Sequence, residues 1–197
     1  MATRIVTTRM PTKYGAFQLA VYNDGKSELN HLALIKAPQL IAQNEPLVRI
    51  HSECLTGDLF ASLRCDCGDQ LNGALQAISK ESCGILIYLR QEGRGIGLVN
   101  KMNAYNLQDQ GMDTLEANVH LGFEPDQRDY RTAVDILSDL NASTIRLLTN
   151  NPDKVSTFDE TSILVIERIP LQIAPNQENK RYLETKLNRF NHILESP

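Results

Sequence analysis

The first quarter of the chain contains three short stretches in which apolar residues have the spacing of strands. The pattern predicts a strand over residues 16–22, and alternation of apolar and polar positions predicts two more over 31–37 and 47–52. A turn signal, Asn-Asp-Gly-Lys at 23–26, follows the first of them. We therefore expect the N-terminal part of the chain to form an antiparallel meander.

After residue 68 the apolar residues change to a helical spacing. Leu71, Ala74 and Ile78 lie at this spacing and predict a helix, and the run at 85–89 predicts a short buried strand. The remaining predicted elements are, in chain order, a helix at 98–111, a helix at 130–140, a strand at 144–149, a strand at 163–168 and a helix at 178–194. Such alternation indicates parallel βαβ units. The chain is thus predicted to be an α/β protein with a mixed sheet, which has βαβ units after residue 68 and the antiparallel meander before it.

The overall composition is that of an ordinary globular protein. The 197 residues are 42% hydrophobic and 22% charged, and we expect a single domain over residues 1–197 that ends in the C-terminal helix. The longest apolar stretch, at 84–89, is far shorter than the ~20 residues of a membrane span. The start of the chain lacks the apolar segment of a signal peptide. We therefore expect a cytoplasmic protein without a membrane partner.

The charge of the chain limits the class of partner. The net charge is −4, whereas a general nucleic-acid binder needs a basic face. We therefore expect no nucleic-acid partner. A local basic pocket for one small polyanion is compatible with this charge.

Three of the four cysteines lie close together in the sequence. Cys65 and Cys67 are two positions apart and can point the same way on an extended segment, and Cys54 lies eleven positions before Cys65. Cytosolic thiols stay reduced, so metal binding is expected rather than disulfides. Three thiolates would hold zinc and leave its fourth position open for water, as in catalytic zinc sites. Two alternatives stay open: the cysteines are small buried residues, or His51 is a fourth ligand that closes a structural site.

Three segments carry residues that are suited to binding phosphate. The glycine-rich segment at 91–98 follows a strand and opens a helix, so its backbone N–H groups could approach an anion, although a plain turn is the alternative. Thr149 and Lys154 follow another strand and could contact phosphate oxygens. Asp126 and Arg128 are either an N-cap with a solvated charge or a general base with a cation for a transferring phosphate. Together with an open zinc site, these features favour a purine nucleoside triphosphate as the substrate.

Four longer motifs resemble one known family. The motifs of GTP cyclohydrolase II are similar to RIHSECLTGDLFASLRCDCGDQL, YLRQEGRGIGLVNKMNAYNLQDQGMDTLEAN, LGFEPDQRDY and LLTNNPDKV. The likeness runs over nearly the whole chain. It implies zinc-dependent hydrolysis of GTP to 2,5-diamino-6-ribosylamino-4(3H)-pyrimidinone 5′-phosphate, formate and pyrophosphate, a step of riboflavin biosynthesis. The resemblance further implies the stand-alone form of the enzyme and a homodimer.

The resemblance also implies roles for individual residues. One zinc ion per chain would bind the three clustered cysteines, and Mg²⁺ would accompany the triphosphate. Asp126 matches the proton acceptor of the family. Arg128 matches a residue proposed as the nucleophile on the α-phosphate, but a guanidinium stays protonated in proteins, so we expect it to stabilise charge instead. The resemblance implies that the hydroxyl of Tyr105 lies near the reacting formyl group. Contacts to GTP would come from Arg49, Ile50, His51, Ser52, Glu53, Gln70, Glu92, Gly93, Arg94, Thr114, Thr149 and Lys154.

Two other functions are compatible with the sequence. Some similar cyclohydrolases stop at the formamide, but they carry another residue at the position of Tyr105, so this tyrosine favours full release of formate. The second alternative is a zinc protein that binds GTP without turnover. The matched metal and catalytic residues are all present, which argues against it.

Overall fold

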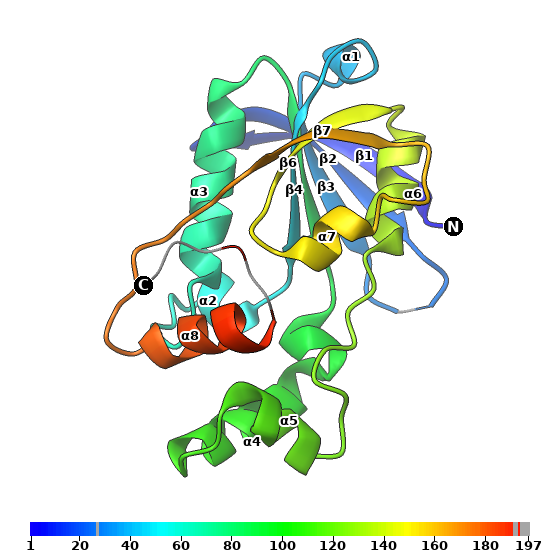
Figure 1. Cartoon of the computed structure of the whole chain (residues 1–197). Helices are drawn as coiled ribbons and strands as arrows, with labels where there is room; N and C mark the ends of the chain where they lie inside the picture. Colours follow the sequence, from blue (N-terminus) through cyan, green and yellow to red (C-terminus); the bar gives the residue numbers. More distant parts are fainter. Residues whose placement is uncertain (27, 191–192, 194–197) are drawn as a thin grey trace.

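The fold is built on one sheet of seven strands. The computed structural model describes residues 1–26, 28–190 and 193. The strands lie in the order β1-β2-β3-β5-β4-β6-β7, with helices on both sides (Figure 1). The strands are β1 Thr3–Thr12, β2 Gly15–Asn23, β3 His31–Lys36, β4 Leu47–Ser52, β5 Gly84–Leu89, β6 Thr144–Leu148 and β7 Leu164–Ile169.

The first three strands form the predicted antiparallel meander. β1 pairs with β2, and β2 pairs with β3, each in the antiparallel direction. The sequence pattern predicted β2 and β3 but missed β1. β1 is an edge strand of the sheet with mostly exposed side chains, so it lacks the alternation that reveals a half-buried strand.

The other four strands form a parallel half. β4 pairs in parallel with β5 on one side and with β6 on the other, and β6 pairs in parallel with β7. An antiparallel contact between β3 and β5 joins the two halves. β4 and β5 are almost fully buried, as expected for parallel strands that are covered on both faces. The predicted α/β class with a mixed sheet is confirmed.

Helices cover both faces of this sheet. The helices are α1 Pro38–Ile41, α2 Leu55–Asp58, α3 Cys67–Lys80, the 3-10 turn η1 Glu92–Gly95, α4 Gly97–Asp109, α5 Thr114–His120, α6 Arg131–Asp139, α7 Pro152–Ser156 and α8 Lys180–Arg189. Ile78 of α3 packs with Leu86 of β5 in one apolar cluster, and Ile136 of α6 packs with Ile85 of β5 in the other. Adjacent residues of β5 therefore face opposite layers, with α3 and α6 on opposite sides of the sheet (Figure 1).

The segments that follow three neighbouring parallel strands all begin at the same edge of the sheet. β5, β4 and β6 are adjacent and point the same way. The chain passes from β4 through α3 to β5 and then returns to β6 on the other side of β4. In open α/β sheets, ligands bind at the carboxyl ends of the strands where the connections diverge in this way. This edge is therefore where a functional site is expected.

The observed elements differ from the predicted ones mainly at their ends. The segment at 150–154 was predicted to be a break, but α7 begins there, because the side chain of Asn151 accepts a hydrogen bond from the backbone N–H of Asp153. The helix predicted over 178–194 is present as α8, and residues 191, 192 and 194 lie outside the described residues. Among the described residues, every helix is too short or too polar to span a bilayer.

Candidate active site

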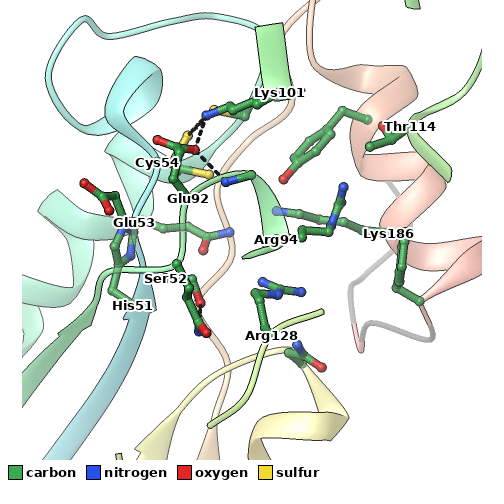
Figure 2. A pocket seen from close by; sticks show the side chains of 18 of the residues that line it. His51, Ser52, Glu53, Cys54, Glu92, Arg94, Lys101, Thr114, Arg128 and Lys186 are labelled. Carbon is green, nitrogen blue, oxygen red and sulfur yellow. Dashed lines mark hydrogen bonds and ion pairs between the residues drawn. The ribbon is translucent and has the colours of Figure 1, made fainter. Parts of the chain in front are cut away.

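A pocket opens at the carboxyl ends of β4, β5 and β6. It contains about 1090 Å³ of empty space, part of it open to solvent. Its wall combines a cluster of cysteines, the turn η1 and a group of lysine and arginine side chains. Figure 2 shows Cys54 near Lys101 and Glu92 on one side, and Arg94 and Arg128 on another.

Cys54, Cys65 and Cys67 converge on one point. Their Sγ atoms all lie within 4.8 Å of one another, and the Sγ atoms of Cys54 and Cys65 are 3.7 Å apart. Cys54 follows β4, Cys65 lies between α2 and α3, and Cys67 is the first residue of α3. All are free thiols. A metal ion could therefore bind between the three sulfur atoms.

The surroundings of the three sulfur atoms suit a metal ion. A β-carbon added to Gly57 would lie 2.9 Å from Sγ of Cys65 and 3.2 Å from Sγ of Cys54, so only glycine leaves the cluster its space. Thiolates are soft ligands that bind zinc well. In the described part of the chain, no further histidine, cysteine or carboxylate joins this group. The three thiols are therefore a donor set that could bind zinc.

The sequence left open whether His51 is a fourth metal ligand. In the structure His51 is not part of the cysteine cluster and pairs with Asp58 instead. Its Nε2 atom lies 3.0 Å from Oδ1 of Asp58, and burial lowers the pKa of its imidazole. Asp58 also accepts hydrogen bonds from the backbone N–H of Cys54 at 3.0 Å and from the hydroxyl of Tyr88 at 2.8 Å. His51 and Asp58 therefore brace the segment that carries Cys54.

Lys101 on α4 lies directly beside the cysteine cluster. Its Nζ atom is 3.1 Å from Sγ of Cys54 and 2.8 Å from Oε1 of Glu92. Hydrogen bonds from Cys65 and Cys67, together with the charge of Lys101, hold the pKa of the Cys54 thiol below its ordinary value. This favours the thiolate form, which is the form that binds metal.

Tyr105, also on α4, places its hydroxyl near the cluster. The hydroxyl lies 3.4 Å from Oγ1 of Thr56, which is itself 3.6 Å from Sγ of Cys54. Burial raises the pKa of Tyr105, so its hydroxyl stays protonated at neutral pH. A protonated phenol in this position can donate a hydrogen bond or a proton to a bound molecule.

The turn η1 has an unusual backbone at two of the predicted contact residues. Gly93 and Arg94 both have left-handed conformations, with φ of 63° and 61°. For a residue other than glycine, such a conformation costs about 1–3 kcal/mol and is enriched at functional sites. The guanidinium of Arg94 lies 4.7 Å from the ring centroid of Phe190 and 5.7 Å from that of Tyr182. These contacts fix the side chain at the pocket.

Arg49 and Lys154 are buried cations at the strand ends. Arg49 donates a hydrogen bond of 2.6 Å to Oε1 of Gln70, and Lys154 donates one of 2.8 Å to the carbonyl of Ile50. Neither forms an ion pair with a carboxylate within the described residues. Burial and neighbouring cations lower the pKa of Lys154 well below its ordinary value. An anion that enters the pocket would offset the cost of burying these charges.

Asp126 and Arg128 form an ion pair in the segment before α6. Nε of Arg128 is 2.9 Å from Oδ1 of Asp126, and its NH2 group contacts the other carboxylate oxygen. Burial alone would raise the pKa of Asp126, but the hydrogen bond and charge of Arg128 outweigh burial and lower it. The N-cap residue of α6 is Tyr130, without a side-chain cap, so Asp126 is not the cap of this helix. Arg128 stays protonated because Tyr130 and Asp126 favour its charge more than burial opposes it.

Most of the predicted residues line this one pocket. Those at its wall are Cys54, Cys65, Cys67, Arg49, His51, Ser52, Glu53, Gln70, Glu92, Gly93, Arg94, Tyr105, Thr114, Arg128, Thr149 and Lys154. Two predicted residues are not at the wall: Ile50 has its side chain in the core, and Asp126 contacts the pocket residue Arg128. The lining residues that sequence reasoning missed include Lys101, Tyr182, Lys186 and Phe190. Lys101 could have been found, because it lies four positions before Tyr105 and so on the same helix face.

The sequence matches one protein family over most of its length. A family model described as GTP cyclohydrolase II matches residues 3–170. The chain belongs to the GTP cyclohydrolase II family. The resemblance expected from the motifs is therefore confirmed. The residues that line the pocket lie within the matched region, except for those on α8 and at its C-cap.

Curated relatives of this GTP cyclohydrolase II family member include riboflavin biosynthesis proteins RibBA. The RibBA of Chlorobium phaeovibrioides is 51% identical over 195 residues, which are 98% of this chain and 47% of the relative. The RibBA of Bacillus cereus strain B4264 is 51% identical over 195 residues, 98% of this chain and 49% of the relative. The chain thus spans about half the length of these relatives. Among solved structures, RibBX, a two-domain 3,4-dihydroxy-2-butanone 4-phosphate synthase from A. baumannii, has a TM-score of 0.48 and 17% identity, over 87% of this chain and 40% of that chain.

Proposed function

We propose that the protein is a zinc-dependent GTP cyclohydrolase II that converts GTP into 2,5-diamino-6-ribosylamino-4(3H)-pyrimidinone 5′-phosphate, formate and pyrophosphate. The observation that carries this proposal is that a three-thiol metal site and a group of buried cations line the same pocket. Membership in the GTP cyclohydrolase II family supports the reaction. The RibBA relatives support a place in riboflavin biosynthesis.

The cysteine cluster is the part of the pocket where the guanine ring would react. A zinc ion held by the three thiolates would supply a Lewis acid with one open position. Tyr105 would donate a hydrogen bond or a proton to the oxygen that develops on the five-membered-ring carbon, because its protonated hydroxyl lies beside the cluster. Lys101 and Glu92 would hold Cys54 in place through their shared ion pair and the contact to sulfur.

The cations at the strand ends are the part of the pocket where the triphosphate would bind. Arg49 and Lys154 would contact phosphate oxygens, with Mg²⁺ bound to the triphosphate as well. Arg128 would stabilise the charge that develops at the α-phosphate as pyrophosphate leaves. Asp126 orients that guanidinium and is the proposed proton acceptor. The other predicted contacts at the pocket wall would complete the nucleotide site.

Three wider expectations belong to the same proposal. We propose that residues 1–197 form one cyclohydrolase domain that includes α8, because this helix shares the pocket. We propose a homodimer, for which the exposed apolar side chains of Leu59, Phe60 and Leu63 offer a contact surface. A cytoplasmic location would suit the free thiols, since a reducing compartment keeps them available for metal.

Turnover of GTP tests the proposed function. The purified protein, incubated with GTP and Mg²⁺, should release formate and pyrophosphate in equal amounts. A zinc chelator should abolish formate release, and added zinc should restore it. ATP is the matched control substrate and should react far more slowly. Adenine presents different donors and acceptors from guanine, so polar groups of the pocket that pair with guanine would be left unpaired. Cys54→Ser should lose both zinc and formate release, whereas Cys83→Ser, which alters a core cysteine outside the cluster, should keep its zinc.

Each other outcome of this experiment has a definite meaning. A product that keeps its formyl group would identify a formamide-releasing variant. GTP that binds without turnover would identify a nucleotide-binding zinc protein. Formate release at the normal rate by zinc-free Cys54→Ser would contradict the role assigned to the cysteine cluster.

A further inference from the structure

The C-terminal helix α8 forms one wall of the pocket. It lies beyond residues 3–170, the part of the chain that the family model matches. Tyr182 and Lys186, one helical turn apart, and Phe190 at the C-cap all line the pocket. Lys186 of α8 bonds to Asp66 in the segment between α2 and α3, so the helix lies next to the cysteine cluster. The pocket therefore contains side chains that neither the sequence motifs nor the family match cover.

Lys186 is a buried cation on this helix. It is 7% exposed, and its Nζ atom donates a hydrogen bond of 2.6 Å to Oδ1 of Asp66. Asp66 lies between two of the clustered cysteines in sequence and also accepts a hydrogen bond from Gln70. A lysine ammonium has three N–H donors, so the ion pair with Asp66 leaves donors for a molecule in the pocket.

The same helix also positions Arg94. The guanidinium of Arg94 faces the rings of Tyr182 and Phe190, with centroid distances of 5.7 Å and 4.7 Å. Such cation–π contacts are attractive and hold the charge in a defined place. Figure 2 shows Lys186 on the same side of the pocket as Arg94. α8 therefore adds one cation to the pocket and fixes a second.

The charge balance of the pocket calls for an anion. Its described lining includes six lysines and arginines but only two glutamates. Both of these, Glu53 and Glu92, already form ion pairs. Burial, together with nearby cations that include Lys186, lowers the pKa of Lys154. Three of the six cations have a carboxylate partner: Lys101 pairs with Glu92, Arg128 with Asp126 and Lys186 with Asp66. The other three, Arg49, Arg94 and Lys154, form no ion pair within the described residues, so a ligand with several negative charges would compensate them.

We propose that α8 is part of the triphosphate site: Lys186 binds phosphate oxygens, and Tyr182 and Phe190 hold Arg94 where it binds them too. This assignment rests on the proposed function, because it takes the triphosphate of GTP as the anion. Lys186 keeps its bond to Asp66 and uses its remaining N–H groups for the ligand. The C-terminal helix thus completes a site whose other cations come from the ends of β4, β5 and β6.

Steady-state kinetics test the role of Lys186. Lys186→Ala should raise KM for GTP by about tenfold or more, the usual effect of losing a hydrogen bond to a charged group, while kcat changes less. Lys186→Arg should keep most of the affinity because it keeps the charge. Lys180→Ala is the matched control, since it removes the same charge from an exposed position of the same helix, and KM should not change.

A double variant separates phosphate binding from simple neutralisation of Asp66. Asp66→Asn combined with Lys186→Met removes both charges of the ion pair. If Lys186 binds phosphate, the double variant should keep the raised KM while zinc content stays at the wild-type level. A double variant with wild-type KM would overturn the proposal, because it would show that Lys186 only neutralises Asp66.

Calorimetry with inorganic tripolyphosphate makes the test independent of turnover. The wild type and Lys180→Ala should bind this anion, whereas Lys186→Ala and Tyr182→Ala/Phe190→Ala should bind it about tenfold more weakly. If the wild type binds tripolyphosphate in this pattern but does not convert GTP, the proposed function fails and the assignment of α8 stands. If GTP is converted and Lys186→Ala binds tripolyphosphate as tightly as the wild type, the assignment of α8 alone is wrong.

Discussion

Lys101 brings a positive charge into contact with a cysteine that is proposed to bind the metal. Three thiolates donate more charge to zinc than three imidazoles would, which makes the ion a milder Lewis acid. The ammonium group 3.1 Å from Sγ of Cys54 withdraws part of that charge. The same contact favours the thiolate over the thiol. If the cluster binds zinc as proposed, this buried lysine would help to set both the affinity for the metal and its reactivity.

Replacing Lys101 should weaken metal binding. Lys101→Met removes the charge and the N–H···S contact while it keeps a chain of similar length. Zinc affinity, measured by competition with a coloured chelator, should fall by about tenfold or more, the range found for groups that support metal ligands. Lys101→Arg is the control and should retain most of the affinity. An unchanged zinc affinity in Lys101→Met would show that the contact is incidental.

Asp126 should make stability depend on pH. Burial opposes its charge, but Arg128 keeps the folded-state pKa below the ordinary value of about 3.9. The ion pair therefore stabilises the fold above that pH, and this contribution is lost as pH falls through the lower folded-state pKa. Asp126→Asn should lower the free energy of unfolding at pH 7 by about 2 kcal/mol, and by less near pH 3. Urea unfolding at both pH values measures this, with the exposed Glu124→Gln as control. An equal loss at both pH values would rule out the ion pair as the cause.

At the scale of elements, the sequence predicted strands β2 to β7 and the four longest helices, and it missed the exposed edge strand β1 and the shorter helices. β2 to β5 showed alternation or a short apolar run, because one or both of their faces are covered. β1 is exposed, and α2 and η1 have four residues each, which is too short for a helical period. α5 did carry a local signal, the capping box of Asp113 and Glu116.

The same reasoning explains how much of the site was predictable. Cys65 and Cys67 are two positions apart, so their closeness in space is local. Their common direction comes from the turn into α3, where Asp66 has φ −102° and ψ 10°, and not from the extended segment that the sequence predicted. The pair of Lys186 and Asp66 joins positions 120 residues apart, and no local pattern encodes such a contact. Only the folded chain brings α8 to the pocket.

Asp58 connects α2 with β4 and β5, and its loss should destabilise the molecule. Its carboxylate accepts hydrogen bonds from the backbone of Cys54 and from Tyr88, and it pairs with Nε2 of His51. Asp58→Ala leaves all three groups without this acceptor and should lower the free energy of unfolding by about 3 kcal/mol. Tyr88→Phe removes only one contact and should cost about 1 kcal/mol. Urea unfolding compares the two, and equal losses would contradict the proposed junction.

At the scale of the whole molecule, the sheet order brings together segments that lie far apart in the chain. β5, β4 and β6 are neighbours, so the segments after them meet at one edge, and α8 closes the pocket there. Figure 2 shows Cys54 beside Lys101 and Glu92, whereas Arg128 and Lys186 lie in another part of the pocket. One molecule with a base and a polyphosphate can contact both parts at once. This arrangement is what connects the fold to the proposed chemistry.

X-ray absorption at the zinc edge tests most directly whether three cysteines hold zinc with one position open to the pocket. The zinc-loaded protein should show three sulfur atoms at about 2.3 Å and one lighter atom at about 2.0–2.2 Å. Cys83→Ser should give the same spectrum, since this cysteine lies outside the cluster. A fourth sulfur atom, the scattering pattern of a bound imidazole, or the absence of bound zinc would contradict the proposed open site.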